Sequence, residues 1–149
     1  MAKLKILTEG ETALRLKSRP VSVINERILT LLDDMVETMR AADGCGLAAP
    51  QVGVLRRVVV VETEPGKVYE LINPVIVKRE GHQRSIEGCL SVPGKEGYTN
   101  RPMKVTVEAL DRYGEKQVYE GEGLLAKAFC HEIDHLDGIL YIDHAEMVV

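Results

Sequence analysis

The spacing of apolar residues predicts a long amphipathic helix near the start of the chain. Between residues 23 and 42, apolar side chains recur three or four positions apart, and charged side chains fill the opposite face. The apolar positions are Ile24, Ile28, Leu31, Leu32, Met35, Val36 and Met39. The next segment, 44–53, contains three glycines and a proline. We therefore expect a loop directly after the helix.

The middle of the chain has the character of β-structure. Residues 57–62 include four consecutive valines, which are strong strand formers. A turn at Glu64-Pro65-Gly66 separates this strand from a second one at 68–73, and residues 75–78 form a third.

After Gly81 the apolar residues show no clear periodicity until residues 104–110, where apolar and polar residues alternate as in a strand. A turn at 111–114 connects this strand to 116–119 as a hairpin. We interpret Gly94, Gly97 and Gly114 as turn residues.

A second helix is predicted over residues 123–137, with Gly138 as its left-handed C-terminal cap. The acidic cluster at 120–122 would favour its start through the helix dipole. Its apolar stripe indicates a central, buried helix and consists of Leu124, Leu125, Ala128, Ile133 and Leu136.

Strands and helices are segregated rather than alternating, which favours an α+β fold. We expect antiparallel or mixed β-sheets packed around the second helix, with the N-terminal helix as an additional element. The length of 149 residues suits one domain over 1–149, and a hydrophobic content of 45% is enough for a buried core.

Charge and composition exclude several classes of protein. The net charge of −4 argues against a nucleic-acid-binding face. No apolar run is long enough to span a bilayer, and the N-terminus does not have the pattern of a signal peptide. The three cysteines are an odd number and indicate thiols or metal ligands rather than a disulfide framework. We expect a cytoplasmic protein without membrane contact.

The most informative motif is H-E-x-x-H at residues 131–135, inside the second predicted helix. His131 and His135 lie one helical turn apart, so both imidazoles can reach one metal ion. Glu132 projects close enough to take a proton from water at that ion. Random placement of residues in a chain of this composition would give the motif on the order of 0.01 times.

A catalytic metal site needs a third protein ligand. The candidates are Cys45, Cys89, Cys130, His82, His144 and any carboxylate. Cys130 lies about 100° around the helix from His131, so we interpret it as a small core residue. His82 and His144 lie in polar segments typical of the surface. The residues alone favour Cys89 over Cys45 only weakly.

Three segments together resemble the signature motifs of the peptide deformylases: GCGLAAPQ at 44–51, EGCLS at 87–91 and HEIDH at 131–135. Those enzymes remove the formyl group from the N-terminal methionine of newly synthesised proteins. The resemblance implies that formyl-methionyl nascent peptides are the substrates.

The resemblance also assigns roles to individual residues. It makes Cys89, His131 and His135 the metal ligands and Glu132 the catalytic acid and base. Gln51 and the backbone N–H of Leu90 would stabilise the reacting carbonyl oxygen. The remaining implied roles concern the substrate: the backbone of Gly44, Cys45 and Gly46 would bind the peptide as an added strand, and Arg101 would lie near its carboxyl side.

A thiolate with two imidazoles suits Fe²⁺, Zn²⁺, Co²⁺ or Ni²⁺, and the resemblance points to Fe²⁺. Two departures from the family pattern occur. Cys130 stands where glutamine is common, at a position that is not a ligand. The chain ends at Val149 without the long C-terminal helix that some members use on the ribosome. We therefore expect transient proximity to the ribosome at most.

Two other classes share part of this pattern. A zinc endopeptidase would also carry H-E-x-x-H, but such enzymes usually add a carboxylate or a histidine as third ligand. A metal-stabilised binding module would need a closed site with four ligands, and it would leave Glu132 and Gln51 without a task.

Overall fold

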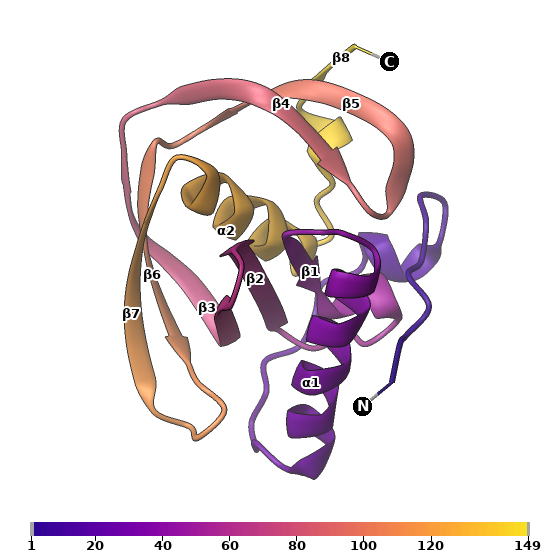
Figure 1. Ribbon diagram of the computed structural model, residues 1–149, viewed down its shortest axis with the longest axis vertical. Helices are drawn as coiled ribbons and strands as arrows, with labels where there is room; N and C mark the ends of the chain where they lie inside the picture. Colours follow the sequence, from indigo (N-terminus) through magenta and orange to yellow (C-terminus); the bar gives the residue numbers. More distant parts are fainter. Residues whose placement is uncertain (1, 149) are drawn as a thin grey trace.

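The computed structural model describes residues 2–148 (Figure 1). Its two α-helices are α1 (Glu26–Ala41) and α2 (Leu124–His135), and short 3₁₀ turns cover Thr12–Arg15, Ala49–Val52 and Tyr141–Asp143. The strands are β1 (Gly46–Ala48), β2 (Val58–Glu64), β3 (Lys67–Glu80), β4 (Gln83–Cys89), β5 (Val92–Arg101), β6 (Lys104–Leu110), β7 (Lys116–Glu122) and β8 (Glu146–Met147). The α+β fold predicted from the sequence is confirmed.

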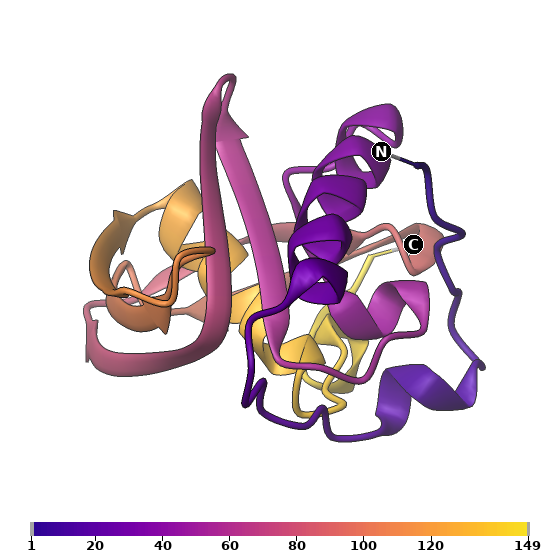
Figure 2. The same ribbon diagram turned by 90° about the horizontal axis from the view of Figure 1, so that it is seen from below.

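The strands form two antiparallel sheets around α2. The larger sheet has the order β1-β2-β3-β6-β7, and the smaller has the order β4-β5-β8. Helix α2 lies in the middle of the molecule, with the β4–β5 hairpin on one side and β1, β2 and β3 on the other (Figure 1). Helix α1 packs beside the larger sheet, close to the N-terminal segment (Figure 2). No helix within residues 2–148 is long and apolar enough to cross a membrane.

The four-valine run of β2 separates two hydrophobic cores. Val59 and Val61 belong to the core around α2, whereas Val58 and Val60 belong to the core around α1. All four side chains are fully buried. Successive residues of a strand point to opposite faces, so an unbroken apolar run is stable only where both faces are covered.

Both predicted helices are present with small shifts at their ends. Helix α1 begins later than predicted, because Asn25 caps it: the Asn25 side chain accepts a hydrogen bond of 3.2 Å from the backbone N–H of Ile28. Helix α2 ends at His135, and Gly138 has the left-handed conformation expected of it, with φ of +75°.

The segment after Gly81, for which the sequence predicted no element, forms the long β4–β5 hairpin. The interpretation of Gly97 as a turn residue was wrong. Gly97 lies in β5 and pairs with Met147 of β8, and a Cβ atom there would lie 2.9 Å from the Met147 sulfur. Gly94 also lies in β5 with a positive φ, whereas Gly114 occupies the predicted turn.

Three further predictions are corrected by the structure. The strands predicted at 68–73 and 75–78 are one strand, β3, with an irregularity in its pairing near Asn73, where φ is +53°. The predicted loop 44–53 contains β1 and a 3₁₀ turn. The acidic cluster 120–122 belongs to β7 and pairs with β6 instead of starting α2.

Replacing Gly138 by alanine should destabilise the fold through a backbone clash. A Cβ atom at Gly138 would lie 2.5 Å from the carbonyl oxygen of Arg15. Gly66 is the matched control, since its φ is +85° and a Cβ atom there meets nothing within 4 Å. We expect a loss of about 3 kcal/mol in the free energy of unfolding for Gly138→Ala and about 1 kcal/mol for Gly66→Ala. Denaturant unfolding measures both, and equal losses would contradict the clash.

Candidate active site

The end of β4 and one face of α2 bring Cys89, His131 and His135 together. The ligand atoms of these three residues all lie within 4.8 Å of one another. Cys89 Sγ lies 3.4 Å from His135 Nε2. The imidazole rings are 5.0 Å apart, as expected for side chains one helical turn apart. The structure thus brings together the three residues that the resemblance selected.

The donor set fits a divalent transition metal. With ordinary bond lengths and a tetrahedral angle, a sulfur and a nitrogen bound to one zinc ion lie about 3.6 Å apart, close to the separation of Cys89 and His135. Burial and the neighbouring His131 hold the pKa of His135 well below its ordinary value, so this imidazole is neutral. Within residues 2–148 the group contains three ligands, which is the number of an open catalytic site rather than a closed structural one.

Glu87 orients His131, and the sequence analysis did not identify it. The Nδ1–H group of His131 donates to Glu87 Oε1 at 2.5 Å, which leaves Nε2 as the only ring nitrogen for a metal. Burial would raise the pKa of Glu87, but the hydrogen bonds from His131 and Arg101 outweigh it and hold that pKa well below the ordinary range. The only signal in the sequence was its position two residues before Cys89, which places the two side chains on one face once this segment is known to be a strand.

Arg101 lies behind the candidate metal ligands rather than among the residues that line the cavity. Its Nε and Nη2 atoms donate to the Glu87 carboxylate at 3.2 and 2.7 Å, and its Nη1 donates to Asp134 at 2.7 Å. Its side chain is only 7% exposed. The structure therefore does not bring Arg101 together with the other predicted substrate-binding residues; it supports Glu87 and, through Glu87, His131.

The carboxyl group of Glu132 is buried between α2 and β1. A Cβ atom at Gly46 would lie 2.5 Å from Glu132 Oε2, so glycine is required for this close approach. Glu132 Oε1 is buried without a hydrogen-bond partner within the described residues. Burial raises the pKa of Glu132 to about 7, against the opposing effect of His131. A carboxyl group with that pKa can both accept and release a proton near neutral pH.

Gln51 is held in one orientation by three contacts. Its Oε1 accepts from the backbone N–H of Ala48 at 2.9 Å, so its Nε2 is the donor. Nε2 donates to Ser91 Oγ at 3.0 Å and lies 3.7 Å from Cys89 Sγ. Gln51 is only 1% exposed and lies beside the candidate ligand Cys89.

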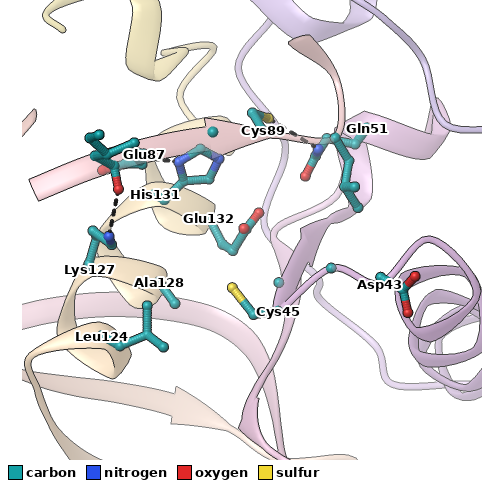
Figure 3. A pocket seen from close by; sticks show the side chains of 15 residues that line it. Asp43, Cys45, Gln51, Glu87, Cys89, Leu124, Lys127, Ala128, His131 and Glu132 are labelled. Atoms are coloured by element: carbon teal, nitrogen blue, oxygen red, sulfur yellow. Dashed lines mark hydrogen bonds and ion pairs between the residues drawn. The ribbon is translucent and has the colours of Figure 1, made fainter. Parts of the chain in front are cut away.

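A pocket of about 350 Å³ opens beside these residues (Figure 3). It is lined by the predicted substrate-binding segment, by residues of β4 and α2, and by all three predicted catalytic residues. These residues are Asp43, Gly44, Cys45, Gly46, Gln51, Ile86, Glu87, Gly88, Cys89, Leu90, Leu124, Lys127, Ala128, His131 and Glu132.

The other candidate ligands lie elsewhere. Cys130 is buried in the core around α2, and burial raises the pKa of its thiol to about 11. His82 and His144 are on the surface, as predicted. Cys45 lines the pocket but does not belong to the ligand group.

Replacing Glu87 by glutamine should weaken metal binding. The loss of an oriented carboxylate behind a histidine ligand typically lowers metal affinity about 10–100-fold, and competition with a chromophoric chelator measures it. The matched control is Thr99→Val, since the Thr99 hydroxyl donates to the other oxygen, Glu87 Oε2, without contacting His131. Equal losses in the two variants would contradict a direct orienting role of the bond to His131.

Two histidines and a cysteine around one point, a buried carboxyl on the same helix and an adjoining pocket define a metal-dependent hydrolase of the H-E-x-x-H type. The family model described as polypeptide deformylase matches residues 3–148. The chain belongs to the peptide deformylase family, whose members use a metal ion to remove the N-formyl group from nascent peptides.

Individual relatives agree with this membership. The peptide deformylase of Acetivibrio thermocellus is 62% identical over 143 residues, which cover 96% of this chain and 84% of the relative. A crystal structure of a peptide deformylase from Legionella pneumophila has a TM-score of 0.93 at 44% identity, covering 95% of this chain and 85% of that one. The Ehrlichia chaffeensis enzyme in complex with actinonin has a TM-score of 0.94 at 39% identity, with 97% and 89% covered.

Family membership decides among the classes that the sequence left open. The endopeptidase and the metal-stabilised binding module are both rejected, and the protein is an amidohydrolase that releases formate from formylated peptides.

Proposed function

We propose that Cys89, His131 and His135 hold the metal ion of this deformylase and that the ion is Fe²⁺. The supporting observation is the convergence of three soft or borderline donors with His131 already oriented by Glu87. Zn²⁺, Co²⁺ and Ni²⁺ fit the same donors. When bound, such an ion supplies a Lewis acid and lowers the pKa of water towards about 7.

Glu132 is the acid and base of the proposed mechanism. Its carboxylate accepts the proton of the attacking water and then delivers that proton to the departing amine of methionine. The pKa of about 7 suits both steps, because neither protonation state is strongly favoured at neutral pH. Its position against Gly46 places the carboxyl group between the metal ligands and the edge of β1.

Gln51 Nε2 and the backbone N–H of Leu90 stabilise the oxygen of the formyl group as negative charge develops on it. The orientation of Gln51 supports this role, because the hydrogen bond from the Ala48 N–H fixes Nε2, and not Oε1, as the atom beside Cys89. Leu90 follows Cys89 directly and lines the same pocket.

The substrate peptide binds along Gly44, Cys45 and Gly46. Strand β1 lies at the edge of the larger sheet and pairs with β2 on one side, so its other edge can accept an extended peptide. Actinonin, which occupies the Ehrlichia relative, would compete for this pocket. Arg101 acts on the substrate indirectly, through Glu87 and His131.

The wider setting follows from the substrate. Formyl-methionyl nascent peptides arise during translation, so we place the enzyme in the cytoplasm and in transient proximity to the ribosome. Residues 1–149 act as a single catalytic domain, which the central position of α2 between the two sheets supports.

The proposal is tested by formate release and metal content. Protein purified anaerobically with Fe²⁺ should release formate from formyl-Met-Ala-Ser. Cys89→Ala should lose the bound ion and the activity, whereas Cys45→Ala should retain about one ion per chain. A metal-loaded wild type that releases no formate would refute the enzyme assignment. Loss of metal in Cys45→Ala but not in Cys89→Ala would refute the ligand set.

A further inference from the structure

Lys127 is a cation in an otherwise apolar wall of the active-site pocket. This wall is formed by Ile86, Leu124, Ala128 and the aliphatic stem of Lys127. The Lys127 ammonium donates to Ser85 Oγ at 3.1 Å and to the backbone carbonyl of Ile86 at 2.9 Å. Both partners are neutral oxygens. An ammonium group has three N–H donors, so one donor remains.

The position of Lys127 fixes which part of a substrate it can meet. Lys127 precedes His131 by four residues on α2, so it lies one turn, about 6 Å, further along the helix. In Figure 3, Lys127, Ala128 and Leu124 follow α2 on one side of the pocket, and Asp43 lies on the other. Lys127 and Cys45 line the same pocket.

The first side chain of the substrate reaches this wall, an argument that rests on the site roles proposed above. With the formyl group at Cys89, His131 and His135, the sulfur of an extended methionine lies roughly 6 Å from the formyl carbon, which is close to one helical turn. A methionine side chain that follows α2 therefore brings its sulfur level with Lys127. A thioether sulfur is a weak acceptor, so unoxidised methionine makes little use of the remaining N–H.

We infer that Lys127 allows this enzyme to deformylate peptides whose first residue is N-formyl-methionine sulfoxide, by donating its remaining N–H to the sulfoxide oxygen. A sulfoxide is polar, and its burial in a wholly apolar pocket without a hydrogen bond would weaken binding roughly 10–100-fold. The reaction itself is unchanged: water adds its oxygen to the formyl carbon, the C–N bond breaks, and the sulfoxide takes no part.

The same geometry gives the site a stereochemical preference. The sulfoxide sulfur is a chiral centre with two epimers. Because Ser85 and the Ile86 carbonyl hold the ammonium group, its remaining N–H has a fixed direction. One epimer directs its oxygen towards this donor and the other directs it away, so the two should differ in kcat/KM.

The test compares three substrates: formyl-Met-Ala-Ser and the two epimers of its sulfoxide. We expect the metal-loaded wild type to hydrolyse the better epimer with a kcat/KM within about tenfold of the unoxidised peptide. Lys127→Met keeps an unbranched apolar stem that is one atom shorter, and it removes the donor. It should lower the ratio of kcat/KM for the better epimer to kcat/KM for formyl-Met-Ala-Ser by about tenfold or more, and it should no longer distinguish the epimers.

Two controls accompany this variant. Lys127→Gln keeps an uncharged donor and should lie between wild type and Lys127→Met in its preference between oxidised and unoxidised substrate. Lys116→Met, on exposed β7, should behave as wild type. If Lys127→Met is poorly folded, Lys127→Gln decides the result through its ratio of kcat/KM for the oxidised peptide to kcat/KM for the unoxidised peptide.

The outcomes separate two failures. Formate release from the unoxidised peptide with a loss above about tenfold on both epimers, or equal substrate ratios in wild type and both Lys127 variants, would overturn this inference alone. No formate from the unoxidised peptide would overturn the proposed site as well.

Discussion

We expect Glu132→Gln to lower kcat/KM for formate release by about 10²–10⁴-fold, the range found when a general acid and base is removed. The amide of glutamine has nearly the same volume but cannot accept and return a proton. Metal content should stay near that of the wild type, because Glu132 does not belong to the group of Cys89, His131 and His135. Thermal stability should not fall, since the carboxyl oxygen Oε1 is buried without a partner in the described chain.

The control for this variant is Glu122→Gln, at the exposed end of β7 directly before α2. It makes the same chemical change close to the same helix and should leave kcat/KM unaltered. If Glu132→Gln loses its metal together with its activity, Glu132 contributes to holding the ion and its assignment as acid and base is wrong.

Gly46→Ala should lower kcat/KM by about 10²-fold or more, because misplacement of a reacting group by about 1 Å has an effect of this size. The added Cβ atom would lie 2.5 to 2.9 Å from Glu132 Oε2, Cγ and Cδ, so the whole carboxyl group must move. Gly44→Ala is the control in the same segment. Its Cβ atom would meet Leu90 Cδ1 at 2.7 Å, the far end of a flexible side chain.

The double variant identifies the cause of the loss. If Gly46→Ala acts by displacing Glu132, adding it to Glu132→Gln should change kcat/KM little further, because the group that it displaces has already lost its function. Equal losses in Gly44→Ala and Gly46→Ala would instead indicate a general disturbance of the peptide-binding strand.

The sequence predicted the elements whose periodicity was complete. Helix α1, strand β6 and helix α2 bury one regular face each, and their residues repeat accordingly. The β4–β5 hairpin was missed because Gly88, Gly94 and Gly97 interrupt its alternation and because several of its outward positions are apolar, such as Ile86 and Tyr98. Strand β1 was missed because its three residues owe their conformation to pairing with β2.

The sequence predicted the site residues that belong to a recognisable motif. It missed those that come together only through the packing of distant segments. The spacing of His131 and His135 is local and needs nothing beyond a helix. Glu87 meets His131 across 44 positions of sequence, so its role depends on the packing of β4 against α2. Arg101 was placed with the substrate by resemblance, yet all three nitrogens of its guanidinium group donate to Glu87 or Asp134.

Helix α2 belongs both to the candidate metal site and to the hydrophobic core. The concentration of the metal ion should therefore affect the stability of the folded protein. Phe129, Cys130 and Ile133 pack in the core, and the neighbouring His131 and His135 belong to the proposed ligand group. Unfolding of this helix would therefore remove the site. By mass action, an ion at 100 times its Kd adds about 2.7 kcal/mol to the free energy of unfolding. A Tm that rises with ion concentration would show this coupling. Cells short of the metal would then lose the enzyme's activity and would also degrade more of the unfolded protein.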